Sequence, residues 1–129
     1  MILVADDDEA VRKIVANVAR MQGHTVTAVA DGRAAVHACF GVHYDLVITD
    51  LQMPHVTGTE VISQLRAVGY RARFCIMSGS FVHQELPLAQ IKRMFGADAA
   101  LAKPFKRDQL VAVLRAMTIA DGDPDVAKS

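Results

Sequence analysis

The stretch that decides the fold is Leu46-Val47-Ile48-Thr49-Asp50-Leu51-Gln52-Met53-Pro54. Its first four residues are apolar or β-branched, which is typical of a strand buried on both faces in a parallel sheet. Asp50 ends the strand, and open α/β sheets bind their ligands at the carboxyl ends of strands. Pro54 cannot donate a ladder hydrogen bond, so the strand stops before it. On this stretch alone, Asp50 is equally well interpreted as a turn residue, because aspartate is common in turns.

The composition indicates one globular domain. Hydrophobic residues make up 52% of the 129 residues and charged residues 22%, which excludes a disordered chain. Lysine plus arginine equals aspartate plus glutamate, at 14 each, so no basic surplus favours nucleic-acid binding. No cationic leader precedes the first apolar run, and no run approaches the roughly 20 residues of a membrane helix. We therefore expect a cytoplasmic protein with one domain over residues 1–119 and a loose tail over 120–129.

Short apolar runs alternate with segments of helical periodicity along the whole chain. The predicted strands are residues 2–5, 25–30, 46–50, 73–77 and 99–102. Five helices are predicted, each from one apolar face, and the second spans Ala34–Phe40. In chain order, the five faces are Val11, Ile14, Val15 and Val18; then Val36, Cys39 and Phe40; then Val61, Ile62 and Leu65; then Leu88, Ile91, Met94 and Phe95; and finally Leu110, Val113, Leu114 and Met117. This alternation favours an α/β fold, a five-stranded parallel sheet that is doubly wound, with helices on both faces.

Four acidic residues, Asp6-Asp7-Asp8-Glu9, follow the first predicted strand. One of them is expected to cap the next helix, and negative charge in a first turn is favourable. Capping does not require four acids in a row, and like charges this close repel each other. The surplus of carboxylates therefore predicts a cation among them.

Polar side chains follow four of the predicted strands: the acidic run, Asp50, Ser78 and Lys103. The carboxyl ends of parallel strands meet at one edge of the sheet, where ligands bind. Carboxylates with a hydroxyl and an ammonium indicate a Mg²⁺ site that also takes a phosphate group. Asp50 can supply the nucleophile, since carboxylates form aspartyl-phosphate intermediates. Taken singly, each residue is more often a cap, a turn or a surface residue, but their joint placement favours function.

These motifs resemble the receiver domain of response regulators in two-component signalling, the CheY-like family. The resemblance covers Ile2 to about Met117 and rests on Leu3–Asp8, on Ile48–Pro54 with Gly58, on Met77–Gly79 and on Leu101–Phe105. It implies the flavodoxin-like strand order 2-1-3-4-5. It also implies a cis peptide bond between Lys103 and Pro104.

The resemblance implies a role for each residue at the predicted site. Asp50 would accept a phosphoryl group from a histidine kinase or a histidine phosphotransfer protein. Ser78 and Lys103 would contact the phosphoryl oxygens. The added charge would draw Ser78 toward the phosphate and shift the loop after the fourth strand.

Mg²⁺ is the cofactor that the resemblance implies. Asp7 and Asp50 would bind the ion directly, together with the backbone carbonyl of Gln52. Asp6 would contribute mainly through water. The site would therefore combine a metal, a nucleophile and two groups that stabilise phosphate.

The sequence departs from the family pattern in two places. Ala100 occupies the position, three residues before the lysine, where the family commonly has an aromatic residue whose rotamer follows the serine. The connection from Ser78 to Gly96 is a few residues longer than usual and contains Phe81, Val82 and Leu86. A loop folded onto the core and an exposed partner-binding surface are equally good interpretations of these apolar residues.

The function predicted from the sequence is a stand-alone receiver that switches the binding of a downstream protein, without direct contact to nucleic acid or membrane, as a monomer or weak dimer. Loss of phosphate would be intrinsic and Mg²⁺-dependent, so an enzyme in the metabolic sense is not expected. One alternative is a pseudo-receiver, a binding module with the fold but without phosphorylation. The other is a phosphatase resembling the haloacid-dehalogenase type, with Asp6 as nucleophile and Asp8 as general acid.

Overall fold

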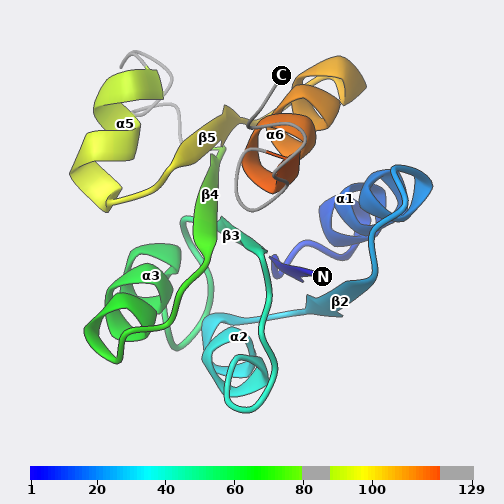
Figure 1. Cartoon of the computed structure of the whole chain (residues 1–129). Coiled ribbons are helices and arrows are strands. Elements are labelled where there is room, and N and C mark those ends of the chain that lie inside the picture. The colour runs from blue at the N-terminus through cyan, green and yellow to red at the C-terminus, as the bar shows by residue number, and fades with distance from the viewer. Residues whose placement is uncertain (80–87, 120–129) are drawn as a thin grey trace.

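The computed structural model describes residues 1–79 and 88–119. Within these ranges, strands and helices alternate as predicted (Figure 1). The strands are β1 Ile2–Ala5, β2 Val26–Val29, β3 Leu46–Asp50, β4 Arg73–Ser78 and β5 Ala99–Ala102. The helices are α1 Glu9–Met21, α2 Gly32–Ala38, α3 Gly58–Ala67, α5 Leu88–Phe95 and α6 Arg107–Ile119.

The five strands form one parallel sheet in the order β2-β1-β3-β4-β5, which confirms the predicted architecture. Every residue of β1 and β3 is buried, because these strands have a neighbour on each side and helices over both faces. In Figure 1, α2, α3 and α5 lie on one side of the sheet, and α1 and α6 lie on the other.

The alternation of side chains along each strand divides the core into two layers. In β1, Leu3 and Ala5 belong to the layer under α2 and α3, whereas Ile2 and Val4 belong to the layer under α1 and α6. Successive strand residues point to opposite faces, so one apolar strand supplies both layers. The helices also supply buried side chains to both layers. Those in the first layer include Ala35, Val61, Ile62 and Leu65, and those in the second include Val15, Val18, Leu110 and Leu114.

Two residues that were predicted to face the core are exposed. Phe40 is 65% exposed, because α2 ends at Ala38 and the helical period that placed Phe40 inward no longer applies beyond that point. Helix α2 also begins earlier than predicted, at Gly32. Ile14 is 54% exposed, because the buried stripe of α1 runs through Val15 and Val18 and is completed by alanines. Small alanine side chains let the helix approach the sheet, and apolar periodicity alone does not reveal them.

Three predictions about the remaining chain have different outcomes. The fourth predicted helix is present as α5, but the facing of its apolar side chains is not described. The apolar segment from Phe81 to Leu86 and the tail over 120–129 lie outside the described residues. No helix in the described ranges is long and apolar enough to cross a membrane.

Candidate functional site

The predicted site residues converge at the carboxyl edge of the sheet. Asp50 and Ser78 are the last residues of β3 and β4, Asp6 follows β1, and Lys103 follows β5. Asp6, Asp50 and Ser78 are buried, although polar residues of these types are mostly found on protein surfaces. Four segments that are distant in the sequence therefore contribute polar side chains to the same edge of the sheet.

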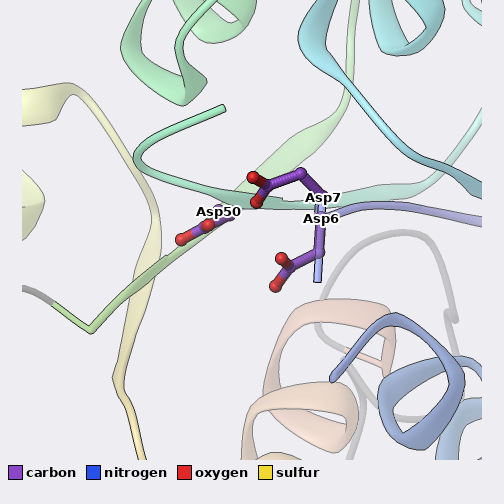
Figure 2. Close-up of side chains that lie close together, drawn as sticks. All are labelled: Asp6, Asp7 and Asp50. Atoms are coloured by element: carbon purple, nitrogen blue, oxygen red, sulfur yellow. The ribbon is translucent and has the colours of Figure 1, made fainter. Parts of the chain in front are cut away.

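Three carboxylates form the centre of the site (Figure 2). Asp6, Asp7 and Asp50 each offer an oxygen atom, and these atoms all lie within 4.8 Å of one another. Asp6 has no exposed surface, and Asp50 is 8% exposed. Asp7 is exposed, so two buried carboxylates lie beside a third at the surface. Like charges this close are unfavourable unless a cation compensates them. Carboxylate oxygens are the ligands that Mg²⁺ prefers, so these residues fit the predicted ion.

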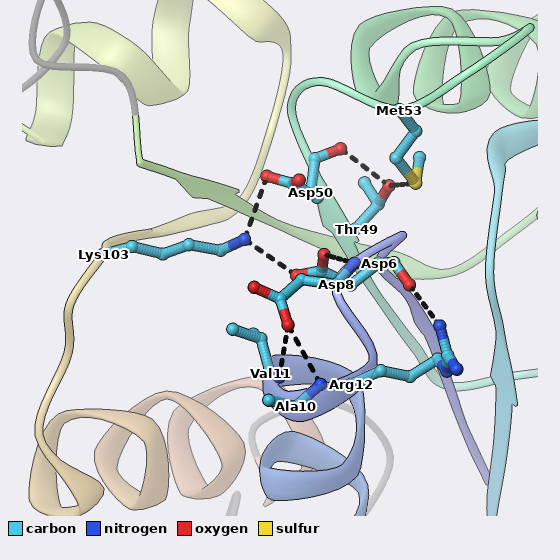
Figure 3. A network of polar contacts seen from close by, with 9 residues as sticks. All are labelled: Asp6, Asp8, Ala10, Val11, Arg12, Thr49, Asp50, Met53 and Lys103. Carbon is cyan, nitrogen blue, oxygen red and sulfur yellow. Dashed lines mark hydrogen bonds and ion pairs between the residues drawn. The ribbon is translucent and has the colours of Figure 1, made fainter.

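Lys103 connects the two buried carboxylates (Figure 3). Its Nζ atom donates a hydrogen bond to Asp6 Oδ2 at 2.8 Å and lies 3.4 Å from Asp50 Oδ1. Burial by itself would lower the pKa of Lys103, but the two carboxylates outweigh it and the pKa is raised. The lysine is therefore held in its charged form, and its ammonium pairs with two of the three carboxylates.

The pKa of Asp50 is raised to about 6. Burial is the main cause, and repulsion from Asp6 and Asp7 adds to it, while Lys103 acts in the opposite direction. The charged form of Asp50 is thus under-compensated by the protein alone. A divalent cation beside the three carboxylates would supply the missing positive charge.

The acidic run after β1 divides between capping and the site. Asp8 is the N-cap of α1, and its carboxylate accepts hydrogen bonds from the backbone of the first helical turn. Its own backbone N–H donates to Asp6 Oδ1 at 2.9 Å. Arg12 of α1 donates to the Asp6 carbonyl at 2.9 Å. The prediction that one acid caps the helix is confirmed, and the cap also orients Asp6.

The loop after β3 is folded tightly against the end of that strand. Gly58 N–H donates to the Leu51 carbonyl at 2.9 Å, and Leu51 N–H donates to the Met77 carbonyl at 2.8 Å. A Cβ atom on Gly58 would lie only 2.1 Å from the carbonyl oxygen of Asp50. Glycine is therefore required at this position because the backbones approach closely. The sequence contained Gly58 as part of a motif but did not reveal this contact.

Ser78 and Lys103 are coupled through the backbone. Lys103 N–H donates to the Ser78 carbonyl at 2.7 Å, which holds the end of β4 beside the segment that follows β5. The peptide bond between Lys103 and Pro104 is cis, as the resemblance implied. Ala100 lies in β5 opposite Ile76 and is buried, so the position expected to carry a switch aromatic holds a methyl group within the core.

Sequence reasoning missed one residue of the site and left another as a prediction. Arg12 was not singled out, because a single arginine in the first helical turns carries no motif. Its contact with Asp6 is made through the backbone carbonyl, which only the folded chain defines. Gln52 is exposed in the loop after β3, and the role of its carbonyl in metal binding stays a prediction.

Comparisons with known proteins agree with this geometry. The family model of the response regulator receiver domain matches residues 2–115. The transcriptional regulatory protein TcrA of Mycobacterium tuberculosis is 36% identical over 119 residues, which cover 91% of this chain and 45% of that protein. The chain spans about half the length of the curated relatives that it matches.

Solved receiver structures are similar over nearly the whole chain. The receiver domain of the sensor histidine kinase PA1611 from Pseudomonas aeruginosa, with a magnesium ion coordinated in its active site cleft, has a TM-score of 0.78 and 27% identity, covering 91% of this chain and 95% of that one. The response regulator TrrA from Thermotoga maritima, in complex with Mg²⁺-BeF, has a TM-score of 0.76 and 26% identity, covering 90% and 96%. With its fold, its carboxyl-edge cluster and these matches, the chain belongs to the response regulator receiver domain family.

Proposed function

We propose that Asp50 is the phosphoacceptor of this receiver domain. The observation that carries the proposal is the position of Asp50, at the end of β3 with two further carboxylates and the Lys103 ammonium within a few ångströms. A carboxylate oxygen of Asp50 would attack the phosphorus atom of a phosphohistidine in a histidine kinase or a histidine phosphotransfer protein. The new P–O bond forms as the P–N bond breaks, and the imidazole leaves with the bond's electron pair and takes up a proton.

Asp7, Asp50 and the backbone carbonyl of Gln52 would hold Mg²⁺ directly, with Asp6 contributing through water. When bound, the ion supplies positive charge next to the carboxylates and the incoming phosphoryl oxygens. Lys103 is already positioned as a point charge, and its raised pKa keeps it protonated at neutral pH. Phosphoryl transfer needs mainly positioning and charge stabilisation, which these residues provide.

The phosphorylated state would be read out at β4. A phosphoryl group on Asp50 adds acceptor oxygens, to which the Ser78 hydroxyl would donate. Movement of Ser78 would displace the backbone that follows β4 and change the surface that it presents to a downstream protein. Because Ala100 has no ring that could follow Ser78, this readout would rest on the backbone alone.

Intrinsic hydrolysis would return the domain to its resting state. Water attacks the phosphorus atom, the bond to Asp50 breaks, and the carboxylate and inorganic phosphate are released. The domain would thus act as a cytoplasmic signalling switch that turns over its own phosphate and no metabolite. A phosphatase with Asp8 as general acid is disfavoured, since the Asp8 carboxylate is engaged in capping α1.

Intact mass spectrometry after incubation with acetyl phosphate and Mg²⁺ tests the proposal. We expect one phosphoryl adduct on the wild type and none on Asp50→Asn, while Asp108→Asn, a change of an exposed acid in α6, keeps the adduct. An adduct that survives in Asp50→Asn but disappears in Asp6→Asn would move the nucleophile to Asp6. A folded wild type that binds Mg²⁺ but takes no adduct from acetyl phosphate or a cognate phosphodonor would identify a pseudo-receiver.

A further inference from the structure

A cleft of about 560 Å³ lies at the amino-terminal edge of the sheet. The residues that line it include Asp45, Arg66, Arg71, Arg73, Asp98 and Met117. Arg73 begins β4, and Asp45 and Asp98 immediately precede β3 and β5. The strands are parallel, so this cleft and the carboxylate site are at opposite edges, roughly 17 Å apart along β4. It is therefore separate from the phosphoacceptor site.

The two carboxylates of the cleft already have partners. Asp45 Oδ2 accepts a hydrogen bond from the amino group of Met1 at 2.7 Å. Asp98 Oδ2 accepts one from the Phe74 backbone N–H at 2.8 Å and lies 3.4 Å from Arg66. Neither acid contacts the other two arginines at ion-pair distance. Among residues 1–79 and 88–119, the three guanidinium groups of the cleft thus outnumber its two carboxylates.

Arg66 is held in a fixed position at the cleft. Its Nη2 atom donates to the Gly96 carbonyl at 2.8 Å, and its guanidinium lies 4.9 Å from the centre of the Phe74 ring. These contacts come from two different segments of the chain. A guanidinium that is already ordered loses little conformational freedom when it binds a further partner.

The side chain of Arg73, which lines the cleft, has no partner among the described residues. Its Nε atom is buried and has no hydrogen-bond partner, and it is the one such side-chain atom among the described residues. The side chains of Arg71 and Arg73 make no hydrogen bond or ion pair within residues 1–79 and 88–119. Because Nε is enclosed by protein atoms, a molecule in the cleft can reach only the terminal nitrogen atoms of this guanidinium. The natural partner of a guanidinium edge is an oxyanion, which it binds through two parallel hydrogen bonds.

We propose that this cleft binds a small molecule that bears phosphate or carboxylate groups. Arg73 would bind an oxyanion through its two terminal guanidinium nitrogen atoms, and Arg71 and Arg66 would contribute further positive charge. The cleft volume lies within the range of small-molecule sites. The rings of His43 and Tyr70, with centroids 6.0 Å apart and planes tilted by 32°, line the same cleft and offer aromatic surface to the rest of the ligand. The proposal does not depend on phosphorylation of Asp50.

NMR titration of the ¹⁵N-labelled full chain tests the proposal directly. Pyrophosphate and citrate serve as probes of the two oxyanion classes, at constant ionic strength and without Mg²⁺, so that the carboxylate site repels them. We expect saturable shifts of the Arg73 Nε–Hε signal and of amides in the cleft with at least one probe. The probe that saturates tells whether phosphate or carboxylate is preferred.

Three variants separate a specific site from general charge attraction. Arg73→Lys keeps the charge but removes the planar guanidinium that can bind an oxyanion through two hydrogen bonds, and we expect the affinity to fall at least tenfold. Arg71→Gln changes an exposed residue, so it tests the cleft without risk to folding. We expect it to lower the affinity a few-fold. Arg115→Gln removes an exposed arginine of α6 outside the cleft, and we expect no change. Thermal unfolding of each variant verifies that it is folded.

Two results would overturn the proposal. Shifts that stay linear to high probe concentration, or that weaken equally in Arg115→Gln, would indicate an adventitious ion only. Unchanged affinity in both Arg71→Gln and Arg73→Lys would place the binding elsewhere. Because Asp50→Asn leaves the cleft intact, the same titration on that variant should match the wild type whether or not Asp50 is the phosphoacceptor.

Discussion

Lys103 Nζ lies 2.8 Å from Oδ2 of Asp6, a carboxylate with no exposed surface, and so joins residues that are 97 positions apart in the chain. The contact closes the site between the two segments that follow β1 and β5. It also places the only ammonium within ion-pair distance of the buried carboxylates among the described residues. Several properties of the metal-free protein follow from this pairing.

Replacing Lys103 with methionine should destabilise the metal-free protein. Removing one partner of a buried ion pair leaves the other charge uncompensated, and we expect a loss on the order of 3 kcal/mol in the free energy of unfolding at pH 7.5. Urea denaturation measures it. Lys13→Met is the matched control, because Lys13 also pairs with an acid at 2.8 Å but both side chains are about two-thirds exposed. Its loss should be much smaller, because water screens an exposed pair, and equal losses in the two variants would contradict the prediction.

Asp50→Asn should stabilise the metal-free protein at neutral pH. The pKa of Asp50 is raised from 3.8 when unfolded to about 6 when folded, so the folded state binds the proton more tightly. The charged carboxylate therefore lowers the free energy of unfolding by up to about 3 kcal/mol above pH 6. The loss becomes smaller as the pH falls toward 4 and vanishes below both pKa values. Thermal unfolding between pH 4 and 8 should show the gain of Asp50→Asn growing as pH rises.

Mg²⁺ should reverse the order of stability of the wild type and Asp50→Asn. The ion compensates the carboxylates of the wild type, so its addition should raise the Tm of the wild type more than that of Asp50→Asn. Chelation with EDTA should return both proteins to their metal-free Tm. Equal gains in the two proteins would indicate that the ion binds without Asp50.

Gly58→Ala should disturb the loop after β3. The new Cβ atom would lie 2.1 Å from the Asp50 carbonyl oxygen, so the backbone must move, at a cost of about 2–3 kcal/mol in stability. Displacing the backbone of Asp50 should also weaken Mg²⁺ binding. Gly79→Ala is the control, since its Cβ would meet nothing closer than Lys103 Cδ at 3.5 Å. Calorimetric titration with Mg²⁺ and urea denaturation measure both effects, and similar behaviour of the two variants would refute the explanation.

Cys75 should react with thiol reagents only after unfolding. It is fully buried, and burial raises the pKa of its thiol to about 12, so the reactive thiolate is scarce at pH 8. In a Cys39→Ser variant, which leaves Cys75 as the sole thiol, modification by a chromogenic disulfide should require urea at the concentration that unfolds the chain. Rapid reaction of the native variant would show that β4 opens locally.

Apolar patterning predicted the strands well and the helix faces less well. A strand buried on both faces needs an apolar run, which β1 supplies along its whole length and β3 supplies up to Ile48, before the buried polar residues Thr49 and Asp50. A helix face depends on where the helix ends and on which small residues approach the sheet. Phe40 and Ile14 were misplaced for these two reasons, because neither the end of α2 at Ala38 nor the alanines of α1 stand out in an apolar period.

The sequence by itself determined the α/β architecture and the set of polar residues at the carboxyl edge. Strand polarity follows from the alternation of strands and helices, and it brings every strand's last residue to the same side. Only the tertiary structure decided how those residues pair: Lys103 with Asp6 and Asp50, Arg12 with the Asp6 carbonyl, and Gly58 against the Asp50 backbone. The arginine cleft at the opposite edge likewise required the fold. Contacts between distant segments depend on packing in three dimensions, which no local pattern of residues encodes.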